Sequence, residues 1–443
     1  MRGNIALSAQ LCIAFDRPRV RMLHSTHRLE CRGLSSGLGR VVIVGAGHAG
    51  SAAAAALRQF GWAGRVTLIG EESLPPYQRP PLSKACLKGD ADFAGLLLRP
   101  AAFYPANAIE LRLSERVVRI DRPAKAVRLI TGEAIRYDCL ILALGAAARP
   151  LNVPGAALRG VLALRSVPDA EALRRALRRG VRLVVIGGGY IGLEVAASAR
   201  VLGAEVTVIE RESRVLSRVA CPALSDFFAR EHVARGVRLE CGAAVEALEG
   251  AGGAVAGARL SDGRLLAADL VLVGVGAGPN QTLAREAALA CDDGIVVNER
   301  ARSSDPNIFA IGDCARRPLP LYGRTMRLES VPNALEMAKQ AAAALCGREP
   351  PVPEVPWFWS DQYELRLQIA GLPFDVAQTV SRGNPETGGF ALFHLAADDM
   401  VRAVEAVNAA PEFMAGKTMI ARLRRVAAER LRDPRHTLQE LAS

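Results

Sequence analysis

Short apolar runs recur along this chain, and most of them end at a glycine. The clearest runs occupy residues 41–44, 139–144, 183–186, 206–209 and 270–273, and Thr207 is the one polar residue among them. Runs of this length that alternate with alanine-rich stretches are typical of buried parallel strands connected by helices. Helices are predicted over residues 51–57 and 194–202, shortly after two of the runs. The pattern therefore predicts a doubly wound α/β fold.

Two of the predicted strands lead into a glycine fingerprint of the form Gly-x-Gly-x-x-Gly. Its three glycines allow, in order, a tight turn, close approach of the backbone to a pyrophosphate, and close packing of the following helix on the sheet. The pyrophosphate lies at the helix N-terminus, where free N–H groups and the helix dipole favour negative charge. The predicted binding residues are Gly45, Gly47, Ala49 and Gly50 in the first fingerprint and Gly187, Gly189, Ile191 and Gly192 in the second.

A carboxylate follows each fingerprint at the end of the next predicted strand. Glu71 comes 21 residues after Gly50, and Glu210 comes 18 residues after Gly192. This spacing suits an acid that accepts hydrogen bonds from an adenosine ribose. Two glycine-rich turns without any ligand would leave both acids unexplained. The sequence therefore predicts two dinucleotide-binding sites.

The order of the strands predicts two Rossmann-like dinucleotide-binding domains, one inserted into the other, and a small C-terminal α+β domain. A proline-rich segment at residues 349–353 supports the last boundary, and short alternating strands are predicted beyond it, over 389–395 and 401–408. The predicted spans are 39–146 with 277–349 for the first domain, 147–276 for the second and 350–443 for the third.

Residues 1–38 differ in character from the rest of the chain. They contain several arginines and only two acids, Asp16 and Glu30. Polar residues interrupt the apolar run at 5–15, and no small-residue cleavage site follows it, which argues against a signal peptide. A basic presequence is one interpretation. We adopt the other, an extension that is disordered or is not part of the native chain.

Composition and charge narrow the possible classes of function. The chain has 443 residues, half of them apolar, and a formal net charge of +11. No run of 18 apolar residues predicts a membrane span, and no nucleic-acid-binding motif accompanies the positive charge. The charge is either spread over the surface or gathered on a face that attracts an acidic partner. We expect a monomer or weak homodimer without a membrane or nucleic-acid partner.

The nine cysteines are scattered and include no Cys-x-x-Cys pair. Such an odd, unclustered set indicates neither a disulfide framework nor a zinc site, and we predict no metal site. The same usage favours a reducing, cytoplasmic location.

Several further motifs give the chain a resemblance to a known family. They lie at residues 77–84, 187–197, 303–306, 311–315, 329–334 and 356–363. Together with both fingerprints, they resemble the FAD-dependent ferredoxin reductases typified by putidaredoxin and rubredoxin reductases. The chain is most similar to the members that serve cytochrome P450 and ring-hydroxylating oxygenase systems. The resemblance extends from residue 40 to about residue 410.

The resemblance implies that FAD occupies the first fingerprint and that Glu71 binds its adenosine. It also implies that Asp313 hydrogen-bonds the ribityl–phosphate chain and that Lys84 lies beside the flavin ring. A cation there would favour the negative charge that develops as the flavin is reduced. Lesser FAD contacts are matched by Val117, Arg165 and Val331.

By the same resemblance, the second fingerprint binds the nicotinamide cofactor. Glu210 favours NADH, because a carboxylate repels the 2′-phosphate of NADPH, whereas the nearby Arg211 and Arg214 weaken that preference. Gly276 matches the position at which the nicotinamide end approaches the backbone. NADH is therefore the expected cofactor, with NADPH as the less favoured one.

Lys84 and Glu194 are the predicted catalytic residues, because Glu194 matches a glutamate near the nicotinamide and is expected to pair with Lys84. The implied reaction passes a hydride from NADH to FAD and then single electrons to an iron–sulfur partner. Because this chain has no clustered cysteines, the [2Fe–2S] cluster belongs to a separate ferredoxin. Trp359 and its neighbours Trp357 and Phe358 either line the flavin edge where that ferredoxin docks or pack in a domain interface.

Two other functions stay open at this point. Disulfide reductases and NADH oxidases or peroxidases share both fingerprints, but they need a redox cysteine at the flavin. Only Cys86 lies near that position, and we interpret it as a core thiol. A protein like apoptosis-inducing factor has a similar fold and also binds nucleic acid, which the net charge of +11 permits.

Overall fold

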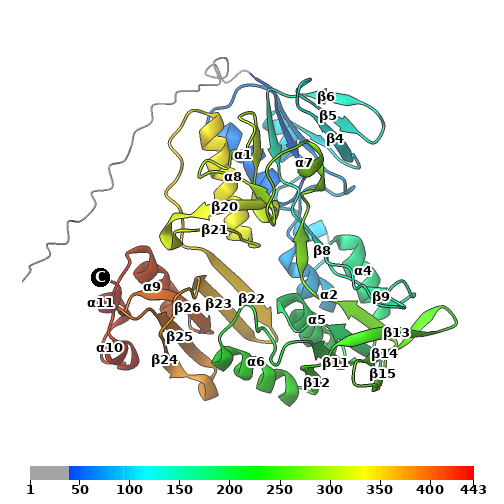
Figure 1. Cartoon of the computed structure of the whole chain (residues 1–443), viewed down its shortest axis with the longest axis vertical. Helices are drawn as coiled ribbons and strands as arrows, with labels where there is room; N and C mark the ends of the chain where they lie inside the picture. Colours follow the sequence, from blue (N-terminus) through cyan, green and yellow to red (C-terminus); the bar gives the residue numbers. More distant parts are fainter. Residues whose placement is uncertain (1–38, 93) are drawn as a thin grey trace, which may run out of the picture.

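A computed structural model describes residues 39–92 and 94–443 of the chain, and the predicted extension 1–38 lies outside these residues. Three five-stranded sheets organise the described part (Figure 1). Two of them are parallel and the third is antiparallel. We call them the first, the second and the C-terminal sheet. They confirm the predicted class, a doubly wound α/β fold with a small α+β domain.

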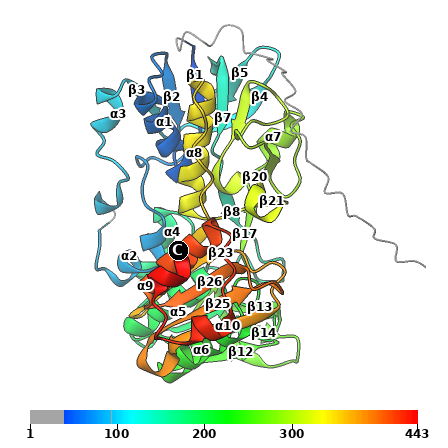
Figure 2. The ribbon, with the colours of Figure 1, turned by 90° about the vertical axis from the view of Figure 1, so that its left-hand side faces the viewer.

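The first sheet carries the first fingerprint, and its strand order is β19-β7-β1-β2-β3. Its strands are β1 (Val41–Val44), β2 (Val66–Ile69), β3 (Ile109–Arg112), β7 (Cys139–Leu142) and β19 (Ile308–Ala310). Helices α1 (His48–Gln59) and α8 (Val331–Leu345) cover one face. The antiparallel strands β4 (Val117–Asp121), β5 (Ala126–Leu129) and β6 (Ala134–Arg136) lie on the other side (Figures 1 and 2). Burial on both faces explains why the strands are continuously apolar.

The second sheet repeats this plan around the second fingerprint, in the order β12-β11-β10-β16-β9. Its strands are β9 (Val161–Leu162), β10 (Arg182–Ile186), β11 (Glu205–Glu210), β12 (Val237–Cys241) and β16 (Leu270–Val273). The elements around it are α4 (Val167–Ala176), α5 (Tyr190–Val201), α6 (Pro222–Ala234), β13 (Val245–Ala251), β14 (Ala254–Leu260) and β15 (Leu265–Ala267). Strands β8 (Ala146–Ala148) and β17 (Ala277–Pro279) pair antiparallel, so the chain leaves the first sheet and returns to it along one ribbon.

One segment of the predicted first domain packs on the second sheet instead. It contains the 3₁₀ turns η1 (Pro80–Ser83) and η2 (Ala94–Leu96) and the short helix α2 (Ala85–Lys88). Leu82, Cys86 and Leu87 belong to the same buried apolar cluster as Leu193 and Val195 of α5. This packing carries Lys84, which follows η1, toward the second fingerprint.

The C-terminal sheet is antiparallel, in the order β22-β23-β26-β25-β24. Its strands are β22 (Trp357–Gln362), β23 (Leu365–Gly371), β24 (Gln378–Asn384), β25 (Gly389–Leu395) and β26 (Val401–Val407). Helices α9 (Ala410–Ala421), α10 (Ala428–Arg432) and α11 (Leu438–Ala442) follow it in sequence. Leu367 and Phe390 of this sheet share a buried cluster with Phe227 of α6, so the C-terminal sheet packs against the helices of the second sheet.

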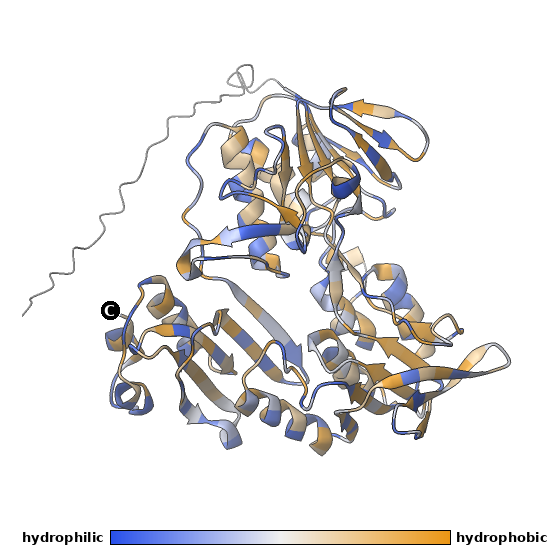
Figure 3. Cartoon of the chain, viewed as in Figure 1, coloured by the Kyte–Doolittle hydropathy of each residue, from blue (hydrophilic) through white to orange (hydrophobic). Residues whose placement is uncertain are grey.

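The remaining short elements connect these layers. They are α3 (Phe103–Ala106), α7 (Thr282–Glu286), β18 (Ile295–Val296), η3 (Gly312–Cys314), β20 (Ala315–Leu319), η4 (Pro320–Tyr322), β21 (Arg324–Arg327) and η5 (Pro385–Thr387). Figure 3 shows hydrophobic residues concentrated on the central strands, whereas α7 at the surface is hydrophilic. Within the described part of the chain, no helix has both the length and the apolar character needed to span a bilayer.

Candidate functional site

A single cleft of about 1430 Å³ runs along the carboxyl ends of both parallel sheets. Both fingerprints line it, as do loops that follow strands of each sheet. In open α/β sheets, ligands bind at this edge of the strands. The cleft therefore brings the two predicted nucleotide sites into one continuous space.

The first glycine turn has no room for a side chain at its first and third glycines, whereas its second glycine faces open space. Gly45 has a φ of +111°, and a Cβ on it would lie 2.2 Å from the carbonyl oxygen of Ala143. A Cβ on Gly50 would lie 1.9 Å from the carbonyl oxygen of Gly45. A Cβ on Gly47 would meet nothing within 4 Å. The open side at Gly47 is where the predicted pyrophosphate would approach.

The second glycine turn is built in the same way. A Cβ on Gly187 would lie 2.4 Å from the carbonyl oxygen of Gly274, and one on Gly192 would lie 2.1 Å from that of Gly187. Gly189 again faces open space. The N-cap residues of α1 and α5 are Gly47 and Gly189, which offer no side-chain cap. Free N–H groups at both helix ends therefore point into the cleft, and the two turns fit two dinucleotide pyrophosphates.

The two predicted ribose-binding acids differ in how firmly they are held. The Glu71 side chain is 68% exposed and lies 3.6 Å from Arg116 Nε. Glu210 is tied to the backbone, because its Oε2 accepts a hydrogen bond from the Gly188 N–H at 2.7 Å and its Oε1 one from the Glu212 N–H at 2.9 Å. Both acids line the cleft, but only Glu210 is oriented by the protein itself.

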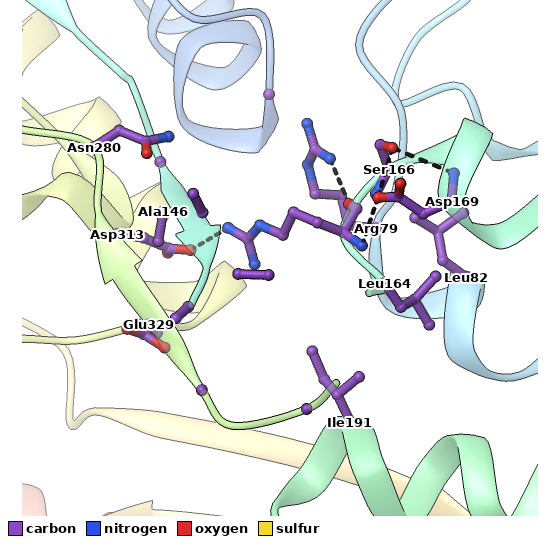
Figure 4. Close-up of a pocket in the computed structure, with 18 of the residues that line it drawn as sticks. Arg79, Leu82, Ala146, Leu164, Ser166, Asp169, Ile191, Asn280, Asp313 and Glu329 are labelled. Carbon is purple, nitrogen blue, oxygen red and sulfur yellow. Dashed lines mark hydrogen bonds and ion pairs between the residues drawn. The ribbon is translucent and has the colours of Figure 1, made fainter. Parts of the chain in front are cut away.

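An ion pair lies at the centre of the part of the cleft next to the first sheet. Arg165 Nη2 donates a hydrogen bond to Asp313 Oδ2 at 2.9 Å. Figure 4 shows Asp313 and Glu329 on one side of this opening, with Leu82, Leu164 and Ser166 on the other. The predicted lesser contacts Val117 and Val331 also line the cleft. Every residue that sequence reasoning assigned to the first nucleotide therefore lines the cleft, except Gly50, which packs within the glycine turn.

Lys84 and Glu194 form the expected pair, with Nζ and Oε2 2.6 Å apart. Their side chains are 17% and 5% exposed. Glu194 Oε2 also accepts a hydrogen bond from Ser83 Oγ at 2.5 Å, and Oε1 accepts one from Ser360 Oγ at 2.7 Å. A buried carboxylate is tolerated only with such partners, so this geometry holds the Lys84 ammonium firmly at the cleft wall.

A hydrogen-bond chain extends from Glu194 into the C-terminal sheet. Gln362 Nε2 donates to Ser360 Oγ at 3.2 Å, and Gln362 Oε1 lies 2.8 Å from His232 Nε2. Burial lowers the pKa of His232 to about 4, so its ring is neutral at pH 7. Because Gln362 Oε1 can only accept, Nε2 carries the proton and Nδ1 accepts from the Tyr363 hydroxyl at 3.3 Å. All these hydrogen bonds therefore point toward Glu194.

The arginines near the second fingerprint have separate roles. Arg214 donates to the carbonyl oxygens of Ala220 and Ser217, each at 2.9 Å, and is occupied by these contacts. Arg211 is mostly exposed and pairs with Glu212 at 3.1 Å. Only Arg211 of these two predicted residues lines the cleft.

Sequence reasoning missed three polar side chains that line or support the cleft. Arg218 stands beside Gly276, where a Cβ would lie 3.3 Å from its Nη2. His48 follows Gly47, and burial, reinforced by Arg79, lowers its pKa to about 4. Ser360 lies in the motif at 356–363, whose aromatic residues alone were considered. No local signal marks Arg218 or Ser360, because their partners are distant in sequence.

The aromatic residues of β22 lie in two different surroundings. Phe358 and Trp359 line the cleft, and the Phe358 ring lies 4.3 Å from that of Tyr190. Trp357 instead packs against Phe413 of α9. Cys86 is fully buried, and burial raises the pKa of its thiol. It is therefore a core thiol and not a reactive one.

Comparison with known proteins agrees with this geometry. The chain matches the family model described as pyridine nucleotide-disulphide oxidoreductase over residues 39–338 and the model described as reductase C-terminal over residues 357–442. The probable ferredoxin reductase CtmF of Castellaniella defragrans is 50% identical over 404 residues, which cover 91% of this chain and 98% of that protein. Putidaredoxin reductase CamA of Pseudomonas putida is 43% identical over 406 residues, which cover 90% and 96%.

Among solved structures, the covalent putidaredoxin reductase–putidaredoxin complex contains a chain that matches this one with a TM-score of 0.89 and 43% identity. The match covers 91% of this chain and 98% of that chain. The family model spans well over half of this sequence, and the relatives are matched over nearly their whole length. The chain therefore belongs to the pyridine nucleotide-disulphide oxidoreductase family and, within it, to the ferredoxin reductases of the putidaredoxin reductase type.

Proposed function

We propose that this protein passes electrons from NADH, through bound FAD, to a small [2Fe–2S] ferredoxin that serves a cytochrome P450 or oxygenase. One observation carries the proposal: both glycine turns open into a single cleft, and the buried pair of Lys84 and Glu194 lines that same cleft. The names of the relatives, which are ferredoxin and putidaredoxin reductases, support the choice of electron acceptor.

Membership of this family implies FAD and a pyridine nucleotide as cofactors. We assign FAD to the first turn, where Gly47 and the N–H groups of α1 would receive its pyrophosphate. Glu71 would bind its ribose, and Asp313 with Arg165 would contact its ribityl–phosphate chain. When bound, FAD supplies hydride acceptance and one-electron release.

We assign NADH, rather than NADPH, to the second turn. The Glu210 carboxylate is fixed by the Gly188 and Glu212 N–H groups and would accept hydrogen bonds from the two ribose hydroxyls. A 2′-phosphate at this place would meet that negative charge. Arg214 is already occupied by backbone carbonyls and does not offset the repulsion.

The role that we propose for Lys84 and Glu194 is electrostatic. An ammonium group fixed at the cleft wall stabilises negative charge that develops on a cofactor next to it. Glu194 accepts hydrogen bonds from Lys84, Ser83 and Ser360, so the pair is oriented before any ligand enters. Such preorganisation avoids the cost of reorienting the groups during electron transfer.

The ferredoxin partner is proposed to be acidic. The formal net charge of +11 would steer a negatively charged protein toward this chain and raise the rate of association. Phe358 and Trp359, which line the cleft, would lie near the docking surface. We propose that the protein works as a monomer or weak homodimer.

Stopped-flow mixing of the FAD-loaded protein with NADH or NADPH tests the proposal. We expect NADH to reduce the flavin at least about tenfold more efficiently, because like charges disfavour NADPH. The reduced protein is then mixed with a panel of [2Fe–2S] ferredoxins at low and high salt. Rapid flavin reduction without reduction of any ferredoxin would contradict the proposed acceptor, and faster reduction by NADPH would contradict the proposed donor.

A Cys86→Ala variant separates this proposal from a disulfide-reductase mechanism. The Cys86 thiol lies in the core beside Leu87, and electron transfer to ferredoxin does not require it. We expect turnover with ferredoxin to be unchanged in this variant. Loss of turnover with intact FAD content would show that Cys86 takes part in the chemistry.

A further inference from the structure

A buried group of three potential metal ligands lies where α6 meets the C-terminal sheet, and none of the three lines the cleft. The group consists of Cys221, His394 and Glu405, and one ligand atom from each lies within 4.8 Å of the other two. Within residues 39–92 and 94–443, it is the one such group of His, Cys, Asp or Glu side chains. Cys221 is the N-cap residue of α6, whereas His394 and Glu405 lie on the adjacent strands β25 and β26.

His394 and Glu405 face each other without a hydrogen bond. Both side chains are 2% exposed, and Nε2 of His394 lies 3.3 Å from Oε2 of Glu405. Despite this distance, neither atom has a hydrogen-bond partner of acceptable geometry among the described residues. Buried polar atoms are rarely left in this state. Two such atoms side by side can be satisfied by one shared cation.

The other polar atoms of the two side chains are fixed by the protein. His394 Nδ1 lies 3.1 Å from Thr379 Oγ1. A proton on Nδ1, donated to this hydroxyl, leaves the lone pair of Nε2 directed at Glu405. Glu405 Oε1 accepts a hydrogen bond from the Cys221 N–H at 3.0 Å, which turns Oε2 toward His394. Histidine and carboxylate ligands of metal ions are typically oriented by such outer contacts.

The Cys221 thiol completes the group from a third direction. It lies at the N-terminus of a 13-residue helix, where the helix dipole favours a thiolate. Burial and the neighbouring Glu405 carboxylate outweigh this effect and that of the Leu224 and Ala223 N–H groups, and they raise the pKa of the thiol to about 12, so a metal ion must displace the thiol proton to bind the sulfur. Cys221 is only half-buried, so an ion has a route from solvent to the site.

We propose that Cys221, His394 and Glu405 bind one Zn²⁺ ion, with water as the fourth ligand. One sulfur, one imidazole nitrogen and one carboxylate oxygen form a donor set that suits zinc and disfavours Mg²⁺ and Ca²⁺. On binding, the thiol proton is released to solvent and the sulfur bonds to the metal. The ion would join α6 of the second sheet to β25 and β26, and would therefore have a structural role.

Cobalt titration of the FAD-loaded, chelator-treated full chain tests this site. Tetrahedral Co²⁺ absorbs in the red, beyond the flavin bands, and we expect these bands to saturate at one equivalent and to disappear on addition of Zn²⁺. Zn²⁺ alone should raise the melting temperature by several degrees, because it binds only the folded protein. The variants Cys221→Ser and His394→Gln should each weaken cobalt binding by about 100-fold or more.

Cys291→Ser is the matched control, since Cys291 is also half-buried but lies outside the group. It should bind cobalt as the wild type does. FAD content verifies that each variant is folded. Absence of saturable binding by the wild type would overturn the proposal, and would identify His394 and Glu405 as a simple buried ion pair. Binding that is unchanged in Cys221→Ser and His394→Gln would overturn it equally.

Discussion

The two glycine turns share one steric design but differ in what surrounds them. In each turn, a Cβ on the first or third glycine would lie within 2.4 Å of a backbone oxygen, and the second glycine faces open space. The acids diverge, since Glu71 is 68% exposed and Glu210 is hydrogen-bonded to the second turn itself. The glycines are constrained by their own strand and helix, whereas the acids depend on neighbours. Similar spacing in the sequence therefore does not mean similar organisation of the two acids.

The second turn also depends on the C-terminal sheet. Glu194, in the helix that follows this turn, accepts a hydrogen bond from Ser360 of β22, and His232 of α6 bonds to Gln362 of the same strand. The first turn is supported by its own sheet and by α8, which packs on α1. Substitutions at matched positions should therefore have different consequences in the two regions.

The largest effect is expected from Gly50→Ala compared with Gly192→Ala. Each added methyl group overlaps a backbone oxygen, and overpacking of this kind costs about 1–3 kcal/mol. Gly50→Ala should abolish FAD retention and with it all turnover. Gly192→Ala should retain FAD but raise the KM for NADH by about 10- to 100-fold. Flavin absorbance after gel filtration and steady-state kinetics measure the two outcomes.

Gly278→Ala is the control for both variants, because a Cβ there meets nothing within 4 Å. It should retain FAD and activity. Equal loss of FAD from Gly50→Ala and Gly192→Ala would show that the two turns are not independent, and would contradict the assignment of one cofactor to each.

Acid should weaken the second region through His232. Burial lowers its pKa from 6.5 to about 4, so the folded protein resists protonation that the unfolded chain accepts. The stabilising contribution of neutral His232 is present above pH 6.5. As the pH falls from 6.5 toward 4 this contribution is lost, and the free energy of unfolding decreases by about 2–3 kcal/mol. A His232→Gln variant should show a smaller loss of unfolding free energy over this range in urea titrations. His436→Gln, a variant of a half-buried histidine outside the second region, should behave as the wild type. A pH dependence of His232→Gln identical to that of the wild type would refute the role of His232.

Removal of the two acids should separate the organised site from the open one. Glu210→Ala deletes a carboxylate that accepts two backbone hydrogen bonds, and a charged hydrogen bond contributes about 1.5–3 kcal/mol. We expect its KM for NADH to rise by about 10- to 100-fold and its discrimination against NADPH to fall. Glu71→Ala removes an exposed side chain with one distant ion pair, worth about 0–1 kcal/mol. We expect the FAD affinity of Glu71→Ala, measured by fluorescence titration, to fall less than tenfold. A fall in FAD affinity larger than the rise in the KM for NADH of Glu210→Ala would reverse the ranking of the two acids.

The smallest effect concerns the support of Glu194 by the C-terminal sheet. Ser360→Ala removes one of the hydrogen bonds to this buried carboxylate, a change of about 1 kcal/mol. We expect the rate of flavin reduction by NADH to fall about fivefold, with an altered pH profile and little change in melting temperature. Ser381→Ala, at an exposed position on the same sheet, should change neither quantity. An unaltered rate in Ser360→Ala would confine the function of Glu194 to its contact with Lys84.

Much of the fold and part of the site could be predicted from the sequence. The helices predicted after the fingerprints are found, although α1 begins at His48 and α5 at Tyr190, directly after the second glycine of each turn. The pair of Lys84 and Glu194 was expected from resemblance and is present at 2.6 Å. The packing of α2 on the second sheet was not anticipated, because an apolar face in the sequence does not specify which sheet will cover it.

The sequence by itself determined the two glycine turns, the parallel strands before them and the positions of both acids. These features depend on local geometry. A glycine can adopt a left-handed φ and has no Cβ, and an apolar period involves only a few neighbouring residues, so each can be recognised in the sequence. Only the tertiary structure decided that Ser360 supports Glu194, that Arg218 stands beside Gly276, and that His394 and Glu405 face Cys221. Those contacts join segments far apart in the sequence, and their geometry is set by how whole sheets and helices pack.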